Sequence, residues 1–286
     1  MQLTSYQTAS DFLLQTQDCL QVNEAANNLI LGILFRLRER PDQFEKEPYL
    51  VTVTDAAGVA LAAMMTPPFN LVLYSDRPDT RLQCELLTQD LLAGGWSPPG
   101  VMAPSVLSKT FAESWSQQTG QSYRAGMRQR VFELRRVVYF GSASGQLLPA
   151  GSADLRLVTD WLHHFTQEAL DEDDLAGMAE LARRHIAAET LYLWHDQGQP
   201  VSMAAKTRQT RHGATVSLVY TPPAWRKRGY ATACVAHLSQ LLLDSGWQFC
   251  SLFTDLANPT SNAIYHKIGY QPRGDFDIYL FQTEPG

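Results

Sequence analysis

The stretch Val216–Thr232 constrains the fold of this chain more than any other. Residues 216–220 are rich in β-formers and alternate in character, which predicts a strand. Two prolines end that strand, because proline cannot donate to a sheet ladder. A helical pattern of apolar residues begins at about Tyr230. Between strand and helix lies a tight basic loop that contains Arg226, Lys227, Arg228 and Gly229.

A strand that leads through a glycine-containing loop into a helix favours the binding of an anion. The first turn of a helix has unpaired N–H groups, and its macrodipole is positive there. Gly229 allows a ligand to approach the backbone closely. Three cations beside a positive dipole end are unfavourable unless an anion lies among them. A solvated basic loop is the alternative interpretation, since basic triplets are common on protein surfaces.

The composition of the whole chain narrows the class of protein. Of 286 residues, 45% are hydrophobic and 18% are charged, as in a globular protein with a real core. The net charge of −6 argues against general nucleic-acid binding. The cysteines form no C-x-x-C pair, so we expect reduced thiols and no metal site. Without a signal-peptide pattern or a membrane span, we expect a cytoplasmic protein with no nucleic-acid or membrane partner.

The two halves of the chain repeat the same order of predicted elements. Short matches support this: residues 59–63 resemble 201–205, Leu73-Tyr74 resembles Val219-Tyr220, and Gly95-Trp96 resembles Gly246-Trp247. Residues 141–152 have the composition of a linker. We therefore predict an α+β fold of two tandem units, each a mixed, mostly antiparallel sheet flanked by helices. The predicted domains are residues 1–140 and 149–286.

Individual elements follow from periodicity and from turn residues. Strands are predicted over residues 49–54, 59–65, 71–74, 129–138, 191–195 and 201–206, and helices over 81–93, 106–119, 154–170 and 175–188.

The first half lacks the basic loop. At the corresponding place it carries Ser75-Asp76-Arg77-Pro78-Asp79, whose two aspartates would repel phosphate. We therefore expect only the second half to bind an anionic ligand, and we expect a structural role for the first.

Two motifs in the second half resemble those of the GNAT superfamily of acetyl-CoA-dependent N-acetyltransferases. The segment Arg226-Lys-Arg-Gly229-Tyr-Ala231 matches the family loop R/Q-x-x-G-x-G/A. About thirty residues further on, Asn258–Tyr270 is similar to the segment in which an Asn, a Tyr and a terminal Gly-Tyr recur. The resemblance covers roughly residues 149–281. The first half resembles the degenerate N-terminal half of tandem GNAT proteins in layout alone.

The resemblance implies where acetyl-CoA, a co-substrate, binds. The strand 217–220 should diverge from the strand 249–254, so that pantetheine pairs with backbone groups between them. Asn258 would bond the pantetheine arm, with Asn262 nearby, and Tyr265 would lie near the thioester sulfur. The full set of implied contacts is Leu218, Val219, Tyr220, Arg226, Arg228, Gly229, Tyr230, Ala231, Thr232, Asn258, Asn262 and Tyr265.

The implied reaction is transfer of an acetyl group to a primary amine of a small molecule or peptide by direct attack on the thioester. Tyr265 is the candidate general acid, because a phenol is a proton donor at neutral pH. A half-buried helix aromatic is the alternative role for this residue. Asn258 stands before a proline and could equally initiate a turn or cap a helix.

The general base is not evident from the sequence. Many relatives carry a glutamate on the strand before the basic loop, whereas residues 215–220 include no carboxylate. Asp255 lies near the motif but could anchor a loop. The acidic group Glu168, Asp171, Glu172 and Asp173 could line a pocket for a cationic amine or form a solvated helix cap. His164 and His185 lie on predicted helices, and a water relay needs no dedicated side chain.

A second hypothesis belongs to another functional class. The protein could bind acetyl-CoA as a regulatory or interaction module and perform no chemistry, which the missing strand carboxylate favours. Other nucleotide-binding and hydrolytic motifs (G-x-G-x-x-G, G-x-x-x-x-G-K-[ST] and H-E-x-x-H) do not occur. The sequence is compatible with a monomer, in which the two halves form a pseudo-dimer, and with a homodimer.

Overall fold

The computed structural model describes residues 1–41, 44, 46–170 and 175–282, which group into two compact units. The first unit consists of Met1–Val131, Thr254–Ala257 and the described part of Arg273–Gly286. The second unit consists of Phe132–Phe253 and Asn258–Pro272. Each unit therefore combines segments that are far apart in the chain. We expected the second domain to span 149–286, whereas residues 132–148 also group with the second unit and the chain's last strand groups mainly with the first.

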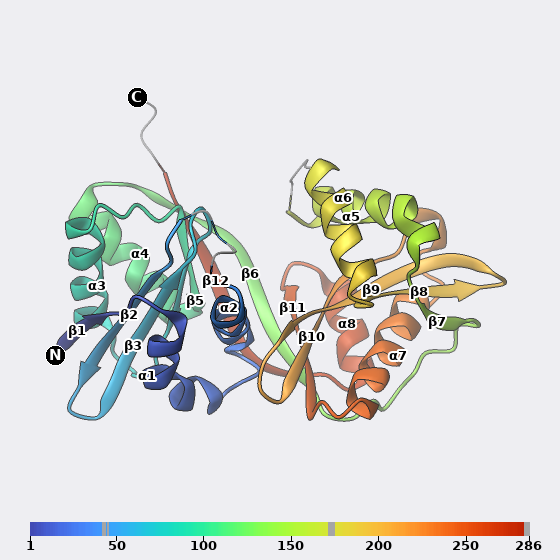
Figure 1. Cartoon of the computed structure of the whole chain (residues 1–286), viewed down its shortest axis with the longest axis horizontal. Coiled ribbons are helices and arrows are strands. Elements are labelled where there is room, and N and C mark those ends of the chain that lie inside the picture. Colours follow the sequence, from blue (N-terminus) through green and yellow to red (C-terminus); the bar gives the residue numbers. More distant parts are fainter. Residues whose placement is uncertain (42–43, 45, 171–174, 283–286) are drawn as a thin grey trace. The chain divides into compact units, whose positions relative to one another are not determined.

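The first unit is a sheet with two helices on each face (Figure 1). Its strands follow the order β1-β2-β3-β4-β5-β12-β6, with β4 and β5 parallel. Its elements are β1 (Gln2–Ser5), α1 (Ala9–Gln21), α2 (Asn28–Glu39), β2 (Tyr49–Asp55), β3 (Gly58–Met65), β4 (Leu71–Tyr74), α3 (Arg81–Ala93), β5 (Gly100–Pro104), α4 (Ser105–Thr119), most of β6 (Tyr123–Leu134) and most of β12 (Gln271–Phe281).

Each face of this first sheet has its own hydrophobic core. Leu87 from α3 and Phe111 and Trp115 from α4 are buried against one face. Phe12 from α1 and Leu34 from α2 are buried against the other. These amphipathic helices are thus held by burial on a sheet rather than by propensity alone.

The second unit repeats this layout (Figure 1). Its strands follow the order β11-β10-β9-β8-β7, and β10 and β11 are parallel, while the other registered pairs are antiparallel. Its elements are β7 (Gln146–Pro149), α5 (Leu155–Leu170), α6 (Leu175–Ala187), β8 (Leu191–Asp196), β9 (Gln199–Gln209), β10 (Gly213–Tyr220), α7 (Tyr230–Asp244), β11 (Phe249–Asp255) and α8 (Pro259–Ile268), with short 3₁₀ turns at Ser152–Asp154 and Pro223–Trp225.

The helices α7 and α8 cover one face of the second sheet, and α5 and α6 cover the other (Figure 1). Val235 and Leu238 of α7 pack with Ile268 of α8 in the first of these cores. Val158 and Leu162 of α5 pack in the second. The end of β6 also contributes Phe132 and Leu134 to the core under α7 and α8.

The predicted fold class of two similar α+β units with mixed, mostly antiparallel sheets is confirmed. The predicted linker, however, is not simply a connection. Residues 146–149 form β7, which pairs with β8, and the strands β5 and β12 were also missed. Their Gly and Pro residues masked the strand signal, because these residues usually mark turns. Among the described residues, no helix has the length and apolar character needed to cross a membrane.

Candidate functional site

The strands β10 and β11 stay paired over only a short stretch. Their parallel register covers Gly213–Thr215 with Phe249–Ser251, and β10 continues to Tyr220 without further registered pairs to β11. This is the arrangement that the resemblance implied for the strand 217–220. Backbone groups at the open end of β10 are therefore free of a ladder partner on the β11 side, at the point where a ligand chain could pair with them.

A bulge shapes that open end of β10. Ser217 pairs with Ala205 and Tyr220 pairs with Met203, so one extra residue lies on β10 between the two pairs. Leu218 takes up the irregularity with a φ of 53°. A non-glycine residue in this region is uncommon, and bulges re-aim strand groups near functional sites. The side chains of Leu218 and Tyr220 pack toward α5, whereas Val219 packs toward α7.

The basic loop ends in a helix start that no side chain caps. Gly229 is the N-cap of α7 with a φ of 83°, and its backbone carbonyl accepts from the N–H of Ala233. A Cβ added to Gly229 would meet only the Ala143 side chain, at 3.7 Å. The first-turn N–H groups, those of Tyr230, Ala231 and Thr232, therefore face an approachable space without a side-chain cap. This is the geometry of a helix N-terminal anion site.

The first turn of α7 is fixed from the β8 side. The Tyr230 hydroxyl donates to Asp196 Oδ2 at 2.6 Å, and the Ser144 hydroxyl donates to Asp196 Oδ1 at 2.7 Å. These two hydrogen bonds hold the pKa of the Asp196 carboxyl below its usual range. The Tyr230 side chain is thus committed to structure, so only its backbone N–H faces the anion site. This cluster could not be predicted from the sequence, because its members are far apart in the chain.

The two arginines of the loop differ in their contacts. Arg226 Nη2 donates to both carboxylate oxygens of Glu168, at 2.9 and 2.7 Å, and Arg226 Nε donates to the Thr221 carbonyl at 2.8 Å. The Arg228 guanidinium lies over the Trp225 ring, 5.0 Å from its centroid. Glu168 is therefore an ion-pair partner of the loop in this structure. Asp171, Glu172 and Asp173, which we grouped with Glu168, lie outside the described residues.

Asn258 and Asn262 lie at the start of α8. Asn258 is the N-cap, and its Oδ1 accepts from the N–H of Ser261 at 3.0 Å. Asn262 Nδ2 donates to the Asn258 carbonyl at 2.7 Å. The capping role that we kept as an alternative for Asn258 is present, and it leaves the Asn258 amide Nδ2 available as a donor.

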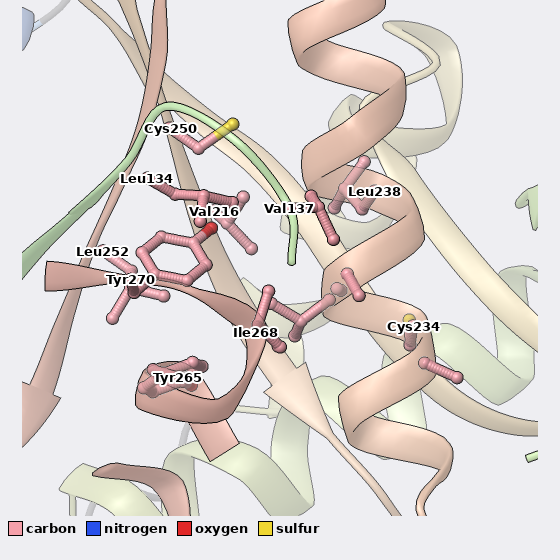
Figure 2. Packing of buried hydrophobic residues seen from close by; sticks show 14 of the residues in the cluster. Leu134, Val137, Val216, Cys234, Leu238, Cys250, Leu252, Tyr265, Ile268 and Tyr270 are labelled. Atoms are coloured by element: carbon pink, nitrogen blue, oxygen red, sulfur yellow. The ribbon is translucent and has the colours of Figure 1, made fainter. Parts of the chain in front are cut away.

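Tyr265 of α8 packs into the core that α7 and α8 cover (Figure 2). Its ring centroid is 5.9 Å from that of Tyr270 and 6.2 Å from that of Phe132. Burial raises the pKa of the Tyr265 phenol to about 12. Tyr270 bonds the Ser239 hydroxyl at 2.8 Å, whereas no described residue hydrogen-bonds the Tyr265 hydroxyl. Tyr265 is thus a protonated phenol that can donate to a ligand.

The remaining candidates divide into structural and site-facing residues. Asp255 accepts the N–H of Ala257 at 2.8 Å and so anchors the turn after β11. His185 Nδ1 and the Thr190 hydroxyl are 2.7 Å apart, and burial lowers the pKa of this histidine. His164 is different, because its ring lies 6.3 Å from that of Tyr220, at the open end of β10.

Residues 151–270 match the family model described as "Acetyltransferase (GNAT) family", the family that the motifs of this region resemble. A comparison with curated proteins finds no match.

Solved structures extend the likeness to the whole chain at the level of the fold. The chain is similar to a GCN5-related N-acetyltransferase from Sphaerobacter thermophilus, with a TM-score of 0.64 at 14% identity over 97% of this chain and 94% of that one. It is similar to an acetyltransferase of the GNAT family from Colwellia psychrerythraea, with a TM-score of 0.60 at 10% identity over 99% and 100%. It is also similar to a tandem GNAT protein from the clavulanic acid biosynthesis pathway, with a TM-score of 0.54 at 11% identity over 97% of each chain.

Proposed function

We propose that the second unit binds acetyl-CoA and transfers its acetyl group to a primary amine of a small molecule or peptide. The observation that carries the proposal is the uncapped start of α7 at Gly229, which follows the bulged end of β10 where that strand leaves β11. This is one continuous backbone surface for a phosphorylated, amide-containing ligand. The GNAT match over residues 151–270 supports the same ligand.

The backbone of the α7 start is the proposed pyrophosphate site. The N–H groups of Tyr230, Ala231 and Thr232 would donate to phosphate oxygens, with Gly229 giving close approach and Arg228 adding charge. Backbone groups of residues 218–220 would pair with the pantetheine amides. Asn258 Nδ2 would donate to the same arm, with Asn262 holding the α8 start in place.

Arg226 can join the phosphate site only by leaving Glu168. The two side chains are 41% and 48% exposed, and an exposed pair of this kind contributes about 1 kcal/mol or less. Exchange of a carboxylate for a phosphate is therefore inexpensive. If Arg226 binds phosphate, the change Glu168→Gln should strengthen acetyl-CoA binding by freeing the arginine. Weaker binding in this variant would instead assign Arg226 to the support of the loop.

Acetyl-CoA supplies an activated acyl group, and the protein supplies position and proton transfer. The bulged backbone near Val219 and Tyr220 would hold the thioester carbonyl, where an N–H donor stabilises the negative charge that develops on oxygen. The Tyr265 hydroxyl would donate its proton toward the departing sulfur. Its buried position and raised pKa keep it protonated until a stronger base is formed beside it.

Calorimetry with acetyl-CoA tests the binding part. We expect one site per chain, weakened in Arg226→Ala/Arg228→Ala and unchanged in the first-unit control Arg77→Ala. Acetyl-CoA at a hundredfold excess over its Kd should also stabilise the fold by about 2.7 kcal/mol. No binding, or equal loss in both variants, would remove the proposed site.

A thiol-release assay tests the transfer. Wild-type protein and acetyl-CoA are incubated with tyramine, spermidine, kanamycin and the dipeptide Ala-Lys, which cover aromatic, polyamine, sugar and peptide amines. Release of thiol together with N-acetyl product supports an N-acetyltransferase. Tight acetyl-CoA binding with no transfer to any amine would favour the non-catalytic module instead.

A further inference from the structure

The end of β6 places a buried carboxylate in the second unit. Phe132 and Leu134 pack in the core under α7 and α8, where Figure 2 labels Leu134. Glu133 between them therefore faces the opposite side of the sheet. Its exposed fraction is only 6%. Glu133 lies outside the region that matches the GNAT family model, and nothing in the mechanism above uses it. A carboxylate buried on a sheet face needs an explanation, because burial of a charge is costly.

The register of β6 against β11 follows from two separate contacts. The Leu256 N–H donates to the Arg128 carbonyl at 2.9 Å, which sets these residues opposite each other on antiparallel strands. The Arg135 guanidinium lies 5.4 Å from the centroid of the Phe249 ring, and this pair fits the same register. Counting along both strands from either pair sets Glu133 opposite Ser251.

Glu133 and Ser251 therefore belong to a row that crosses three neighbouring strands on one face. Directly opposite residues have Cβ atoms about 4.5–5.5 Å apart. Ser251 in turn is registered with Thr215, and their hydroxyl oxygens are 3.1 Å apart. Leu252, Cys250 and Val216, which flank the two hydroxyl residues along their strands, face the other core (Figure 2). The row Glu133–Ser251–Thr215 thus lies on the α5 side of the sheet.

The location of this row matters more than its composition. Thr215 and Ser251 form the last registered pair of β10 and β11, so the row crosses the sheet where the two strands begin to diverge. The strand β10 carries no carboxylate that could serve as a base. Glu133 stands two strands away from β10, and Ser251 of β11 lies between Glu133 and Thr215 in the row.

The charged groups around Glu133 are mainly cationic. On its own strand, Arg135 Nε donates to Glu133 Oε1 at 2.6 Å. On β12, the neighbour of β6 in the sheet, the first ionisable residue of the strand is Arg273. On β9, Arg208 lies over the Phe253 ring, 5.7 Å from its centroid. The carboxylate on β11 is Asp255, at the end of the strand.

We propose that Glu133 is the proton acceptor of the acetyl transfer and acts through the hydroxyls of Ser251 and Thr215. This inference rests on the proposed function. In the step, an N–H bond of the bound ammonium breaks and Thr215 Oγ1 receives that proton, directly or through one water. Each hydroxyl passes on its own proton, and an O–H bond forms on Glu133. The amine nitrogen loses two protons in all: one reaches Glu133 and then solvent, and the other restores the Tyr265 hydroxyl, whose own proton has gone to the sulfur of coenzyme A.

The test is the pH profile of kcat/KM for wild type and Glu133→Gln, measured with the best amine among tyramine, spermidine, kanamycin and Ala-Lys. We expect Glu133→Gln to be about 100-fold slower at neutral pH. The deficit should shrink as the pH rises toward the pKa of the amine, because the amine then arrives already deprotonated. Glu133→Asp should restore part of the activity, and acetyl-CoA affinity should stay unchanged. A deficit independent of pH, or none, would overturn the proposal.

Matched variants separate proton transfer from structure. Thr215→Val and Ser251→Ala keep the carboxylate but break the row, so each should reproduce the pH-dependent deficit even if Glu133→Gln folds poorly. Asp255→Asn removes the carboxylate of β11 and should keep the wild-type profile. If Asp255→Asn alone loses the profile, Asp255 is the acceptor and the proposal is wrong. If the wild-type protein acetylates no amine, the proposed function and this inference are both refuted. If the wild-type protein is active and Glu133→Gln is equally active, only the inference is refuted.

Discussion

The two units lead from a strand into a helix in the same way, but the two helix starts differ. In the first unit, Asp79 Oδ1 accepts the N–H of Arg81 at 3.2 Å, so a carboxylate already occupies the start of α3. In the second unit, α7 begins at Gly229 with no side-chain cap. The start of α3 thus holds a carboxylate of the protein itself, whereas the start of α7 is open to an anion from outside.

The arginines of the two loops differ in the same sense. Arg77 donates to Asp55 at 3.0 and 3.1 Å and to Asp76 at 2.6 Å, and its side chain is only 22% exposed. In the second unit, Arg226 has one exposed carboxylate partner and Arg228 lies over an aromatic ring. A shared backbone layout is therefore not sufficient for anion binding. The loop determines whether an anion binds, because only the second loop has arginines that can exchange their present partners for a phosphate at little cost in free energy.

The comparison predicts that chemistry belongs to the second unit, and Tyr265→Phe tests this with the largest expected effect. Loss of the phenol proton should lower kcat about 100-fold and leave acetyl-CoA affinity unchanged. Thiol-release kinetics and calorimetry measure the two quantities. The matched control is Tyr270→Phe, which loses the bond to Ser239 and about 1 kcal/mol of unfolding free energy but should keep its turnover. Equal losses of kcat in both variants would assign Tyr265 to packing alone.

A smaller effect is expected from Gly229→Ala. The new Cβ has room, but a residue with a side chain is strained at a φ of 83° by about 1 kcal/mol. Relief of that strain would turn the first-turn N–H groups away from the ligand, so we expect acetyl-CoA to bind about tenfold more weakly. Gly95→Ala in the first unit is the control, since Gly95 has a φ of 69° and nothing near its Cβ position. This control should lower the Tm as much as Gly229→Ala does, and it should leave acetyl-CoA affinity unchanged.

Much of the second unit could be predicted because its signals are local. The periodicity placed the start of α7 well, and prolines and a glycine marked the basic loop before α7. The fold class followed from the repeated order of elements. The site residues themselves stay predictions, and the structure adds the uncapped start of α7 and the bulge at Leu218.

What could not be predicted depends on pairing between distant segments. Nothing local in residues 129–138 indicates that Phe132 and Leu134 belong to the core of the second unit, or that Glu133 lies opposite Ser251. The alternating charges of that strand suggest one solvated face, which is the usual meaning of such a pattern. The Asp196 contacts with Ser144 and Tyr230 were missed for the same reason. Strand register is a property of the folded sheet and cannot be obtained from either strand alone.

The smallest effect that we predict concerns the closed loop of the first unit. Hydrogen bonds from Arg77 hold the pKa of the Asp55 carboxyl below its usual range, and the N–H of Arg81 does the same for Asp79. A carboxyl whose pKa is lowered in the folded state stabilises the fold above its unfolded pKa of about 4, and that contribution is lost as the pH falls through the folded value. Thermal unfolding of wild type should therefore show a Tm that falls below about pH 4.

Arg77→Ala removes the main cause at Asp55, so its Tm should fall less steeply with acid, although its Tm at neutral pH is slightly lower. Acetyl-CoA affinity at neutral pH should be that of wild type, because this loop is closed by its own carboxylates. An unchanged acid slope would mean that the Asp55 pair persists too little in solution to matter. Weaker acetyl-CoA binding would be the more serious result, since it would give the first loop a share in the ligand site and remove the contrast between the two helix starts.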